Sequence, residues 1–325
     1  MENDYTKKYI LETGIGLQDV DRLKNSSYFV KESERYLKGE ISLEELDNII
    51  ASYYESKPTT EDRSEEADKI SIRIARLIGE DSFTFTVGQL LTIHKKLFVG
   101  VLKHPGQLRT CNFSKKEWVL DGASVIYGDF RDLEMTLQYD FKTEKQFDYS
   151  RLSIDEAIVH LAVFIANLWQ IHAFEEGNTR TTAVFAIKYL RSLGFDVTNN
   201  DTFAKNAWYF RNALVRANYT NIQKGIYEDR SYLIKFLRNL LLNENNRLEN
   251  KELHITPSSP NKGDTREVRL LVLLKTNPSI KTEELAEELG VSLRTVKSIV
   301  AILKKEGKLK RIGGKKYGRW KVKQE

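Results

Sequence analysis

Two apolar helical runs around one short polar segment constrain the fold of this chain more than any other feature. Residues 153–171 repeat apolar side chains at steps of four and three, which is the period of one helical face. The repeat consists of Ile154, Ile158, Leu161, Ile165 and Leu168. A second apolar run, residues 183–193, stops at Gly194, a residue suited to the left-handed end of a helix. The sequence therefore predicts a mainly α protein in which two buried helices are joined by a tight loop.

The polar segment between these runs reads His-Ala-Phe-Glu-Glu-Gly-Asn-Thr-Arg, from His172 to Arg180. Gly177 and Asn178 tolerate the positive backbone angles of a tight turn, and free N–H groups at a helix start favour an anion. Histidine suits a general base near neutral pH, a carboxylate beside phosphates suits a divalent metal, and arginine suits a phosphate contact. We therefore predict a polyphosphate site with His172 as base and Glu176 as metal ligand. The alternative is a satisfied core histidine followed by an ordinary helix-turn-helix link.

This segment resembles the signature of the Fic family, which runs His-x-Phe-x-Asp/Glu-Gly-Asn-x-Arg-x-x-Arg, and a weaker resemblance extends over residues 61–242. The resemblance implies a mainly helical domain that transfers AMP from ATP to a target Tyr, Ser or Thr hydroxyl. It implies that His172 is the base and that Glu176 carries Mg²⁺. The nucleotide-binding residues expected from it are Phe174, Gly177, Asn178, Thr179 and Arg180.

One position departs from this pattern. Ala183 stands where the family has its second arginine, so the cation expected to bind the γ-phosphate is absent there. Three alternatives stay open. Another cation of the chain supplies the contact, the γ-phosphate is held loosely, or the donor is a diphosphate compound that has no γ-phosphate.

Residues 106–110 and 118–127 resemble the β-hairpin flap of the family, with Asp121-Gly122 as the turn. In relatives this flap aligns the backbone of the target by strand addition. The target-docking candidates are Trp118, Val119, Leu120, Asp121 and Gly122. A plain surface hairpin is an equally good interpretation of the spacing.

The N-terminal segment Leu11-Glu12-Thr13-Gly14 is similar to small Fic antitoxins. In many relatives a glutamate on such a helix pairs with the second arginine and inhibits the enzyme, which makes Glu12 an inhibitory candidate. Because Ala183 replaces that arginine, we favour the alternative, an amphipathic helical cap with no regulatory role.

The C-terminal part of the chain predicts a separate domain. Residues 244–264 have a polar, irregular composition that cannot bury a core, and they predict a linker. Helix and turn signals over residues 265–325 then predict three helices and a β-hairpin, which make a winged helix-turn-helix domain. Its basic surface is of the kind that attracts a DNA backbone, whereas a protein-docking module is the alternative. The DNA-binding candidates are Arg294, Thr295, Lys297, Lys315 and Lys316.

The length of 325 residues suffices for two domains with full cores. We expect an N-terminal helical segment (1–60), a Fic-like domain (61–243), the linker (244–264) and the winged-helix domain (265–325). No run of 18 apolar residues predicts a membrane span. The start lacks the regions of a signal peptide, and the lone Cys111 excludes an internal disulfide, so the expected location is cytoplasmic.

These patterns predict a protein adenylyltransferase that uses ATP and Mg²⁺ to modify a target protein bearing a hydroxyl side chain. DNA is a further expected partner, and a homo-oligomer is left open. One alternative is a DNA-binding transcriptional regulator whose Fic-like domain binds nucleotide without transferring it. The other is a Fic-type transferase of a different phosphate-containing group, such as UMP or phosphocholine.

Overall fold

A computed structural model describes residues 4–56, 63–197, 200–255, 270–271, 273–274, 278, 280–289, 291, 293–312 and 319–323. The contacts between Cα atoms divide the chain into two units. Unit 1 comprises residues 1–221 and 226–255, and unit 2 comprises residues 222–225 and 256–325. Each unit has a hydrophobic core of its own.

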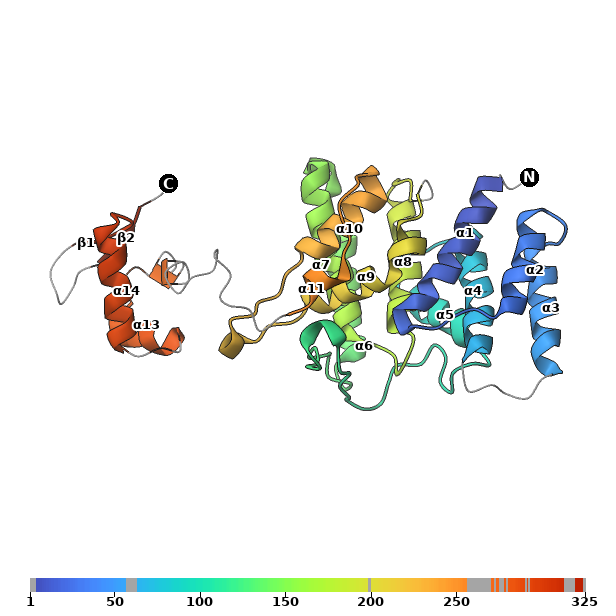
Figure 1. Cartoon of the computed structure of the whole chain (residues 1–325), viewed down its shortest axis with the longest axis horizontal. Helices are drawn as coiled ribbons and strands as arrows, with labels where there is room; N and C mark the ends of the chain where they lie inside the picture. Colours follow the sequence, from blue (N-terminus) through green and yellow to red (C-terminus); the bar gives the residue numbers. More distant parts are fainter. Residues whose placement is uncertain are drawn as a thin grey trace. The chain divides into compact units, whose positions relative to one another are not determined.

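Unit 1 is built from helices (Figure 1). The N-terminal ones are α1 (Asp4–Gly16), the 3₁₀ helix η1 (Leu17–Asp21), α2 (Ser27–Leu37), α3 (Leu43–Glu55), α4 (Ser64–Gly79) and α5 (Val87–Phe98). The following ones are η2 (Trp118–Leu120), α6 (Leu133–Lys145), η3 (Tyr149–Arg151), α7 (Ile154–Ile171), α8 (Asn178–Ser192), α9 (Thr202–Ala217), α10 (Ser231–Leu242) and α11 (Asn250–Leu253). The short helix η4 (Ile222–Lys224) falls in unit 2.

Hydroxyl side chains define where several of these helices begin. Ser42 and Ser153 each form a capping box, with Glu45 and Glu156 as the respective partners three residues later. Thr86 accepts a hydrogen bond from the Gln89 N–H at the start of α5. These side chains satisfy N–H groups that have no partner within the helix, so they fix the first turn of each one.

The helices α7 and α8 confirm the two apolar runs expected from the sequence. The helix α7 packs on α6, α8, α9 and α10, and four of its five periodic apolar residues are buried, with only Ile154 exposed. The helix α7 is long and apolar enough to cross a membrane by composition alone, yet 56% of it is buried inside the unit. That burial fits a central core helix.

The N-terminal helices belong to the same unit as the loop between α7 and α8. The helix α1 packs against α4 and α9, while α2 and α3 cover the outer side of α1 and α4 (Figure 1). A second, smaller core joins these helices through side chains that include Leu11, Phe29, Leu46, Ile50 and Ile72. The described part of the expected N-terminal helical segment (1–60), residues 4–56, therefore packs as part of unit 1.

The first part of the expected linker packs onto unit 1. The Asn246 N–H donates to Asn239 Oδ1 at 2.8 Å, and the Ile255 N–H donates to the Val119 carbonyl at 2.7 Å. Leu253 is completely buried. Although the composition of this segment is polar, it contains a few apolar side chains, and α11 contacts α9 and η2. The rest of the expected linker, residues 256–264, lies outside the described residues.

Unit 2 contains α13 (Thr282–Glu288), α14 (Leu293–Lys305) and an antiparallel sheet of β1 (Leu309–Ile312) and β2 (Arg319–Val322). The register pairs Leu309 with Val322 and Ile312 with Arg319. Trp320 closes a core formed with residues of α13, α14 and the helical residues 270–274 that are described. This arrangement agrees with a helix-turn-helix domain carrying a hairpin. The expected tip of the wing, residues 313–318, lies outside the described residues.

Close helix packing at Gly14 gives a testable prediction. A Cβ atom at Gly14 would lie 2.3 Å from the Ser71 carbonyl oxygen on α4, so Gly14→Ala forces α1 and α4 apart. We expect the free energy of unfolding to fall by about 1–3 kcal/mol in urea titrations. The control is Gly88→Ala on α5, where the nearest atom lies 3.9 Å from the added Cβ and stability should be kept or slightly raised. Equal stability of both variants would contradict this packing.

Candidate active site

The loop between α7 and α8 is held in a fixed shape by its own residues. His172 ends α7 in the left-handed conformation, with φ 52° and ψ 56°, and Gly177 precedes α8 with φ 74°. A Cβ atom at position 177 would lie 2.4 Å from the Phe98 ring, so this position accepts only glycine. Asn178 closes the loop, because its side chain accepts from the Phe174 N–H at 2.9 Å and donates to the Phe174 carbonyl at 2.7 Å.

The His172 ring lies in an aromatic enclosure. It stacks on Tyr127, with ring centroids 3.8 Å apart, and makes edge contacts with Trp169 and Phe113. Its Nδ1 atom lies 3.4 Å from the Trp169 carbonyl oxygen. Because a carbonyl only accepts, Nδ1 carries the proton and Nε2 carries the lone pair. Nε2 is buried without a hydrogen-bond partner, which leaves an acceptor unused.

Burial lowers the pKa of His172 well below its ordinary value of 6.5, and the positive charge of Lys115 lowers it further. The residue as a whole is 3% exposed. The imidazole is therefore neutral at pH 7 and presents Nε2 as an acceptor. This protonation state is the one that a general base needs.

Arg109 positions His172 through backbone carbonyl groups. Its Nε donates to the His172 carbonyl at 2.7 Å, and a terminal nitrogen donates to the carbonyls of Gly128 and Ile171. The Arg109 N–H also donates to the Ala173 carbonyl at 2.9 Å. Sequence reasoning placed Arg109 only at the start of the flap, because a single arginine carries no pattern that reveals a partner 63 residues away.

His94 on α5 supports the other half of the loop, a role that sequence reasoning missed. Its ring stacks on Phe174 with centroids 3.7 Å apart. Its Nε2 donates to the Glu176 carbonyl at 3.1 Å, and its Nδ1 accepts from the Gly106 N–H at 2.7 Å. Burial lowers the pKa of His94 to about 4, so the ring stays neutral in the folded protein. A single histidine on an apolar helix face gave no sequence signal for this role.

Glu176 extends from the loop toward solvent. Its Oε2 lies 2.9 Å from Lys115 Nζ, and the two side chains are 47% and 27% exposed, respectively. The described residues contain no group of three or more His, Cys, Asp or Glu side chains that could hold a metal. One carboxylate together with substrate phosphates is a usual Mg²⁺ site. Glu176 therefore fits a magnesium ion that arrives with a polyphosphate, provided that Lys115 releases it.

The other motif side chains face the interior. Arg180 is fully buried and pairs with Glu66 at 2.8 Å and with Asp21 at 2.9 Å. Thr179 accepts a hydrogen bond from the Trp169 indole at 3.0 Å, and Asn178 is occupied by the loop backbone. Arg180, Thr179 and Asn178 therefore brace the protein in this structure, and their contacts with a nucleotide stay a prediction. Phe174 is buried against His94 and anchors the loop, and its contact with a nucleotide also stays a prediction.

Ala183 and Glu12 were the two positions that the sequence left open. Ala183 is completely buried in α8, so core packing fills the position of the absent arginine. Glu12 lies on the surface of α1, 3.8 Å from Lys8, whereas the carboxylates beside Arg180 are Glu66 and Asp21. The structure thus does not bring Glu12 to the loop.

The expected strand pairing over residues 118–127 is wrong. Residues 118–120 form η2, and only the turn is as expected, with φ of 53° at Asp121 and 83° at Gly122. Val119 and Leu120 are completely buried, and the Val119 carbonyl accepts from Ile255. For Val119 and Leu120, packing in the core outweighs the preference for an extended strand. Because their side chains are buried, they cannot dock a target. Trp118, in contrast, is exposed.

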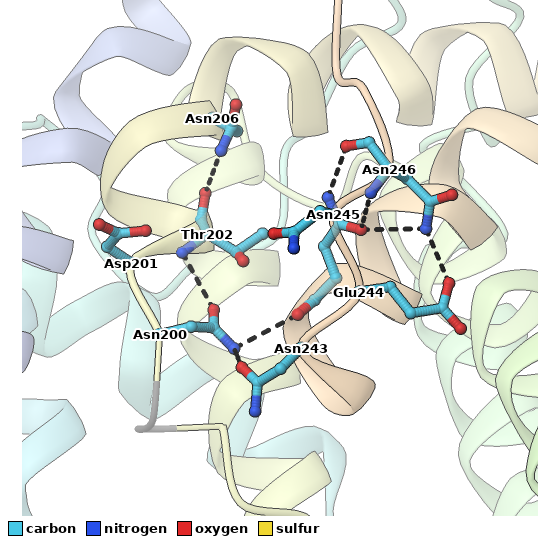
Figure 2. Close-up of a pocket in the computed structure, with 9 residues that line it drawn as sticks. Asn200, Asp201, Thr202, Asn206, Asn243, Glu244, Asn245 and Asn246 are labelled. Atoms are coloured by element: carbon cyan, nitrogen blue, oxygen red, sulfur yellow. Dashed lines mark hydrogen bonds between the residues drawn. The ribbon is translucent and has the colours of Figure 1, made fainter.

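Two pockets of unit 1 lie apart from this loop. Figure 2 shows one of about 260 Å³, in which asparagine side chains connect the start of α9 to the end of α10. The Asn200 amide donates to the Leu240 carbonyl at 2.8 Å and to Asn243 Oδ1 at 2.9 Å. The other pocket, of about 300 Å³, is lined by residues that include Tyr149 and Phe195. Neither pocket includes a residue of the 172–180 loop.

Unit 2 presents some of the expected DNA-binding residues. Arg294 and Lys297 are exposed on the first turns of α14, and Thr295 is half-buried between them. The opposite face of α14 is buried in the core of the unit. Lys315 and Lys316 lie outside the described residues.

Comparison with known proteins gives two family matches and one structural match. Residues 84–190 match the family model described as Fic/DOC family, and residues 266–318 match the one described as HTH domain. A similar solved structure is the crystal structure of a Fic family protein from Desulfovibrio desulfuricans G20. It is 12% identical with a TM-score of 0.45, and the alignment covers 99% of this chain and 87% of that chain. No curated protein matches the chain.

The burial of His94 gives a prediction about stability and pH. The folded pKa of about 4 lies below the ordinary value of 6.5, so the unfolded chain binds more protons between these values. Stability from neutral His94 is therefore present above pH 6.5 and is lost as pH falls, at about 1.4 kcal/mol per pH unit and about 3 kcal/mol in total. In urea unfolding, we expect His94→Gln to have a lower free energy of unfolding at pH 7. Its free energy of unfolding should also fall less steeply as the pH is lowered. His104→Gln, which replaces an exposed histidine beside the loop, is the control. An unchanged slope in His94→Gln would contradict this role.

Proposed function

We propose that this chain, whose residues 84–190 match the Fic/DOC family model and whose residues 266–318 match the HTH domain model, is a protein adenylyltransferase. It moves AMP from ATP to the hydroxyl of a Tyr, Ser or Thr side chain on a target protein. The observation that carries the proposal is the buried Nε2 atom of His172, which has no partner and a lone pair available at neutral pH. A cytoplasmic location stays a prediction.

The transfer assigns each motif residue a distinct role. A bond forms between the target oxygen and the α-phosphorus, the bond from that phosphorus to the β-phosphate oxygen breaks, and pyrophosphate leaves. The hydroxyl proton moves to His172 Nε2, since the proton on Nδ1 is already directed at the Trp169 carbonyl. Arg109 and Tyr127 keep the ring in place during this exchange. Mg²⁺, held by Glu176 and the phosphates, would neutralise charge on the departing pyrophosphate.

Access to His172 requires a local opening. The ring is enclosed by Phe113, Tyr127 and Trp169, of which the first two lie on the segment between α5 and α6. That segment is the one expected to dock the target. We infer that displacement of the Phe113 side chain, while Tyr127 stays stacked on the ring, exposes Nε2 and admits the nucleotide, so that the proton acceptor stays protected until both substrates arrive.

A second function is favoured by Arg180. Its guanidinium, which family resemblance assigns to phosphate, is already neutralised by Glu66 and Asp21 in the interior. A domain in which that pairing persists would bind nucleotide weakly or without transfer. The protein would then be a DNA-binding regulator whose Fic-like domain senses a nucleotide. Retention of the free Nε2 on His172 favours the transferase.

Unit 2 directs the protein to DNA in either case. The exposed Arg294 and Lys297 lie on the first turns of α14, where helix-turn-helix proteins contact base edges. Lys310 and Lys321 pair across the β-hairpin and are exposed as well. These charges would contact phosphate groups of the backbone.

The role of His172 is tested by ATP and UTP labelled at the α-phosphate and by CDP-choline labelled in its phosphocholine group, each with and without Mg²⁺, in the presence of a cell lysate that supplies targets. We expect label from ATP to appear on a protein, and His172→Ala to slow its appearance at least about 100-fold, because general-base catalysis contributes that much. Nucleotide affinity should stay within a few fold. His104→Ala is the matched control and should label at the wild-type rate.

The same experiment separates the alternatives. Equal labelling by wild type and His172→Ala would reject the mechanism. Label from UTP or CDP-choline alone would change the donor and retain the chemistry. Nucleotide binding without any label would favour the regulator.

DNA binding gives a separate prediction. We expect the full chain to bind a mixed-sequence 30-base-pair duplex with an affinity that falls steeply with salt. Lys310→Ala with Lys321→Ala should weaken binding, and each lost phosphate contact should lower the slope of log affinity against log salt by about 1. Lys38→Ala, on the surface of unit 1, is the control. Fluorescence anisotropy provides the measurement, and binding that is equal in all variants would contradict this interface.

A further inference from the structure

We propose that Lys115 is a cation that binds the phosphate chain of the donor nucleotide close to its reacting α-phosphate. The inference rests on the proposed function and extends it to a residue outside the motif. Three observations support it. Lys115 lies beside the candidate site, the neighbouring arginines already have internal partners, and the partner of Lys115 can be exchanged.

The ammonium group of Lys115 lies beside the candidate site. Its Nζ is 2.9 Å from Glu176 Oε2 and 5.9 Å from the centre of the Phe113 ring, which itself touches His172. Among nearby charges, that of Lys115 has the largest effect on the pKa of His172. A positive charge therefore stands close to the place where the reacting phosphate must come within reach of Nε2.

Three arginines whose charges lie near the loop are committed to internal partners. Arg109 donates to backbone carbonyls, and Arg180 pairs with buried carboxylates. Arg211 pairs with the buried Glu117 at 2.6 Å. Removing any of these from its partner would leave a buried charge or carbonyl uncompensated, which costs several kcal/mol.

Lys115, in contrast, has a partner that it can exchange. The carboxylate of Glu176 is 47% exposed, and an ion pair of this kind is worth at most about 1 kcal/mol. The backbone of Lys115 is held by a hydrogen bond to Ser124 Oγ at 3.2 Å, while its side chain is flexible and strongly attracted to phosphate. A divalent cation on Glu176 would compete for the same carboxylate, so metal binding and release of Lys115 would be linked.

The direct test is calorimetric binding of ADP, ATP and adenosine to the full chain in EDTA, so that no metal contributes. We expect Lys115→Ala to weaken ADP and ATP binding about 10- to 100-fold, as expected for the loss of a charge-assisted contact, and to leave adenosine unaffected. Lys115→Arg should retain most of the affinity. The exposed neighbour Lys116→Ala is the matched control and should bind as the wild type does.

The outcomes separate this inference from the proposed function. If the wild-type protein binds none of the three compounds in EDTA, the role of Lys115 is overturned, and if it also binds none of them with Mg²⁺, the proposed function is overturned as well. If the wild type binds ADP and Lys115→Ala binds it equally well, only the role of Lys115 is overturned. Equal weakening for adenosine would also reject it, because a phosphate contact cannot affect a ligand that has no phosphate.

A second variant tests the exchange of partners. Glu176→Gln removes the carboxylate that holds Lys115, so ADP binding in EDTA should tighten. The gain should disappear when the same substitution is made in Lys115→Ala. A gain that persists there would come from the lost negative charge alone and would count against the inference.

Discussion

The geometry of the candidate site depends on one guanidinium group buried at the carboxyl end of α7. The last turn of a helix leaves carbonyl groups without intrahelical partners, and Arg109 donates to those of Ile171 and His172. Its positive charge also lies at the negative end of the helix dipole. The same hydrogen bonds from Arg109 hold His172 in a left-handed conformation, which places its ring in a stack with Tyr127. The orientation of the imidazole, and with it the position of the unused Nε2 atom, is therefore set by contacts to the backbone. The ring itself needs few polar partners to keep this orientation.

The sequence predicts the two helices and the loop of the site better than it predicts the side chains that hold the loop in place. The apolar period and the stop at Gly194 are local signals, and they locate α7, α8 and the loop correctly. His94 and Arg109 act through partners 82 and 63 residues away, and neither residue type nor spacing indicates such pairing. The turn at Asp121-Gly122 was also predictable, since it needs positive φ values. The fate of Val119 and Leu120 was not, because a short apolar run fits a strand or a buried 3₁₀ turn equally well.

Motif residues specify chemical groups, whereas the fold decides which of them remain available. Arg180 has the charge that a phosphate site requires, yet that charge is balanced inside the protein. Lys115 belongs to no recognisable motif, yet its charge faces a half-exposed carboxylate beside the candidate base. The distinction follows from charge balance among segments far apart in the chain. No local pattern can report that balance.

The pairing of Arg180 also sets the smallest fragment that can stand alone. Asp21 comes from η1 and Glu66 from α4, and both precede residue 84, where the family match begins. A fragment trimmed to residues 84–190 would leave the guanidinium in an apolar setting against Phe98 with neither counter-ion. The part of the chain that folds cooperatively is accordingly larger than the matched residues 84–190. It includes the N-terminal helices, which supply the counter-ions of Arg180.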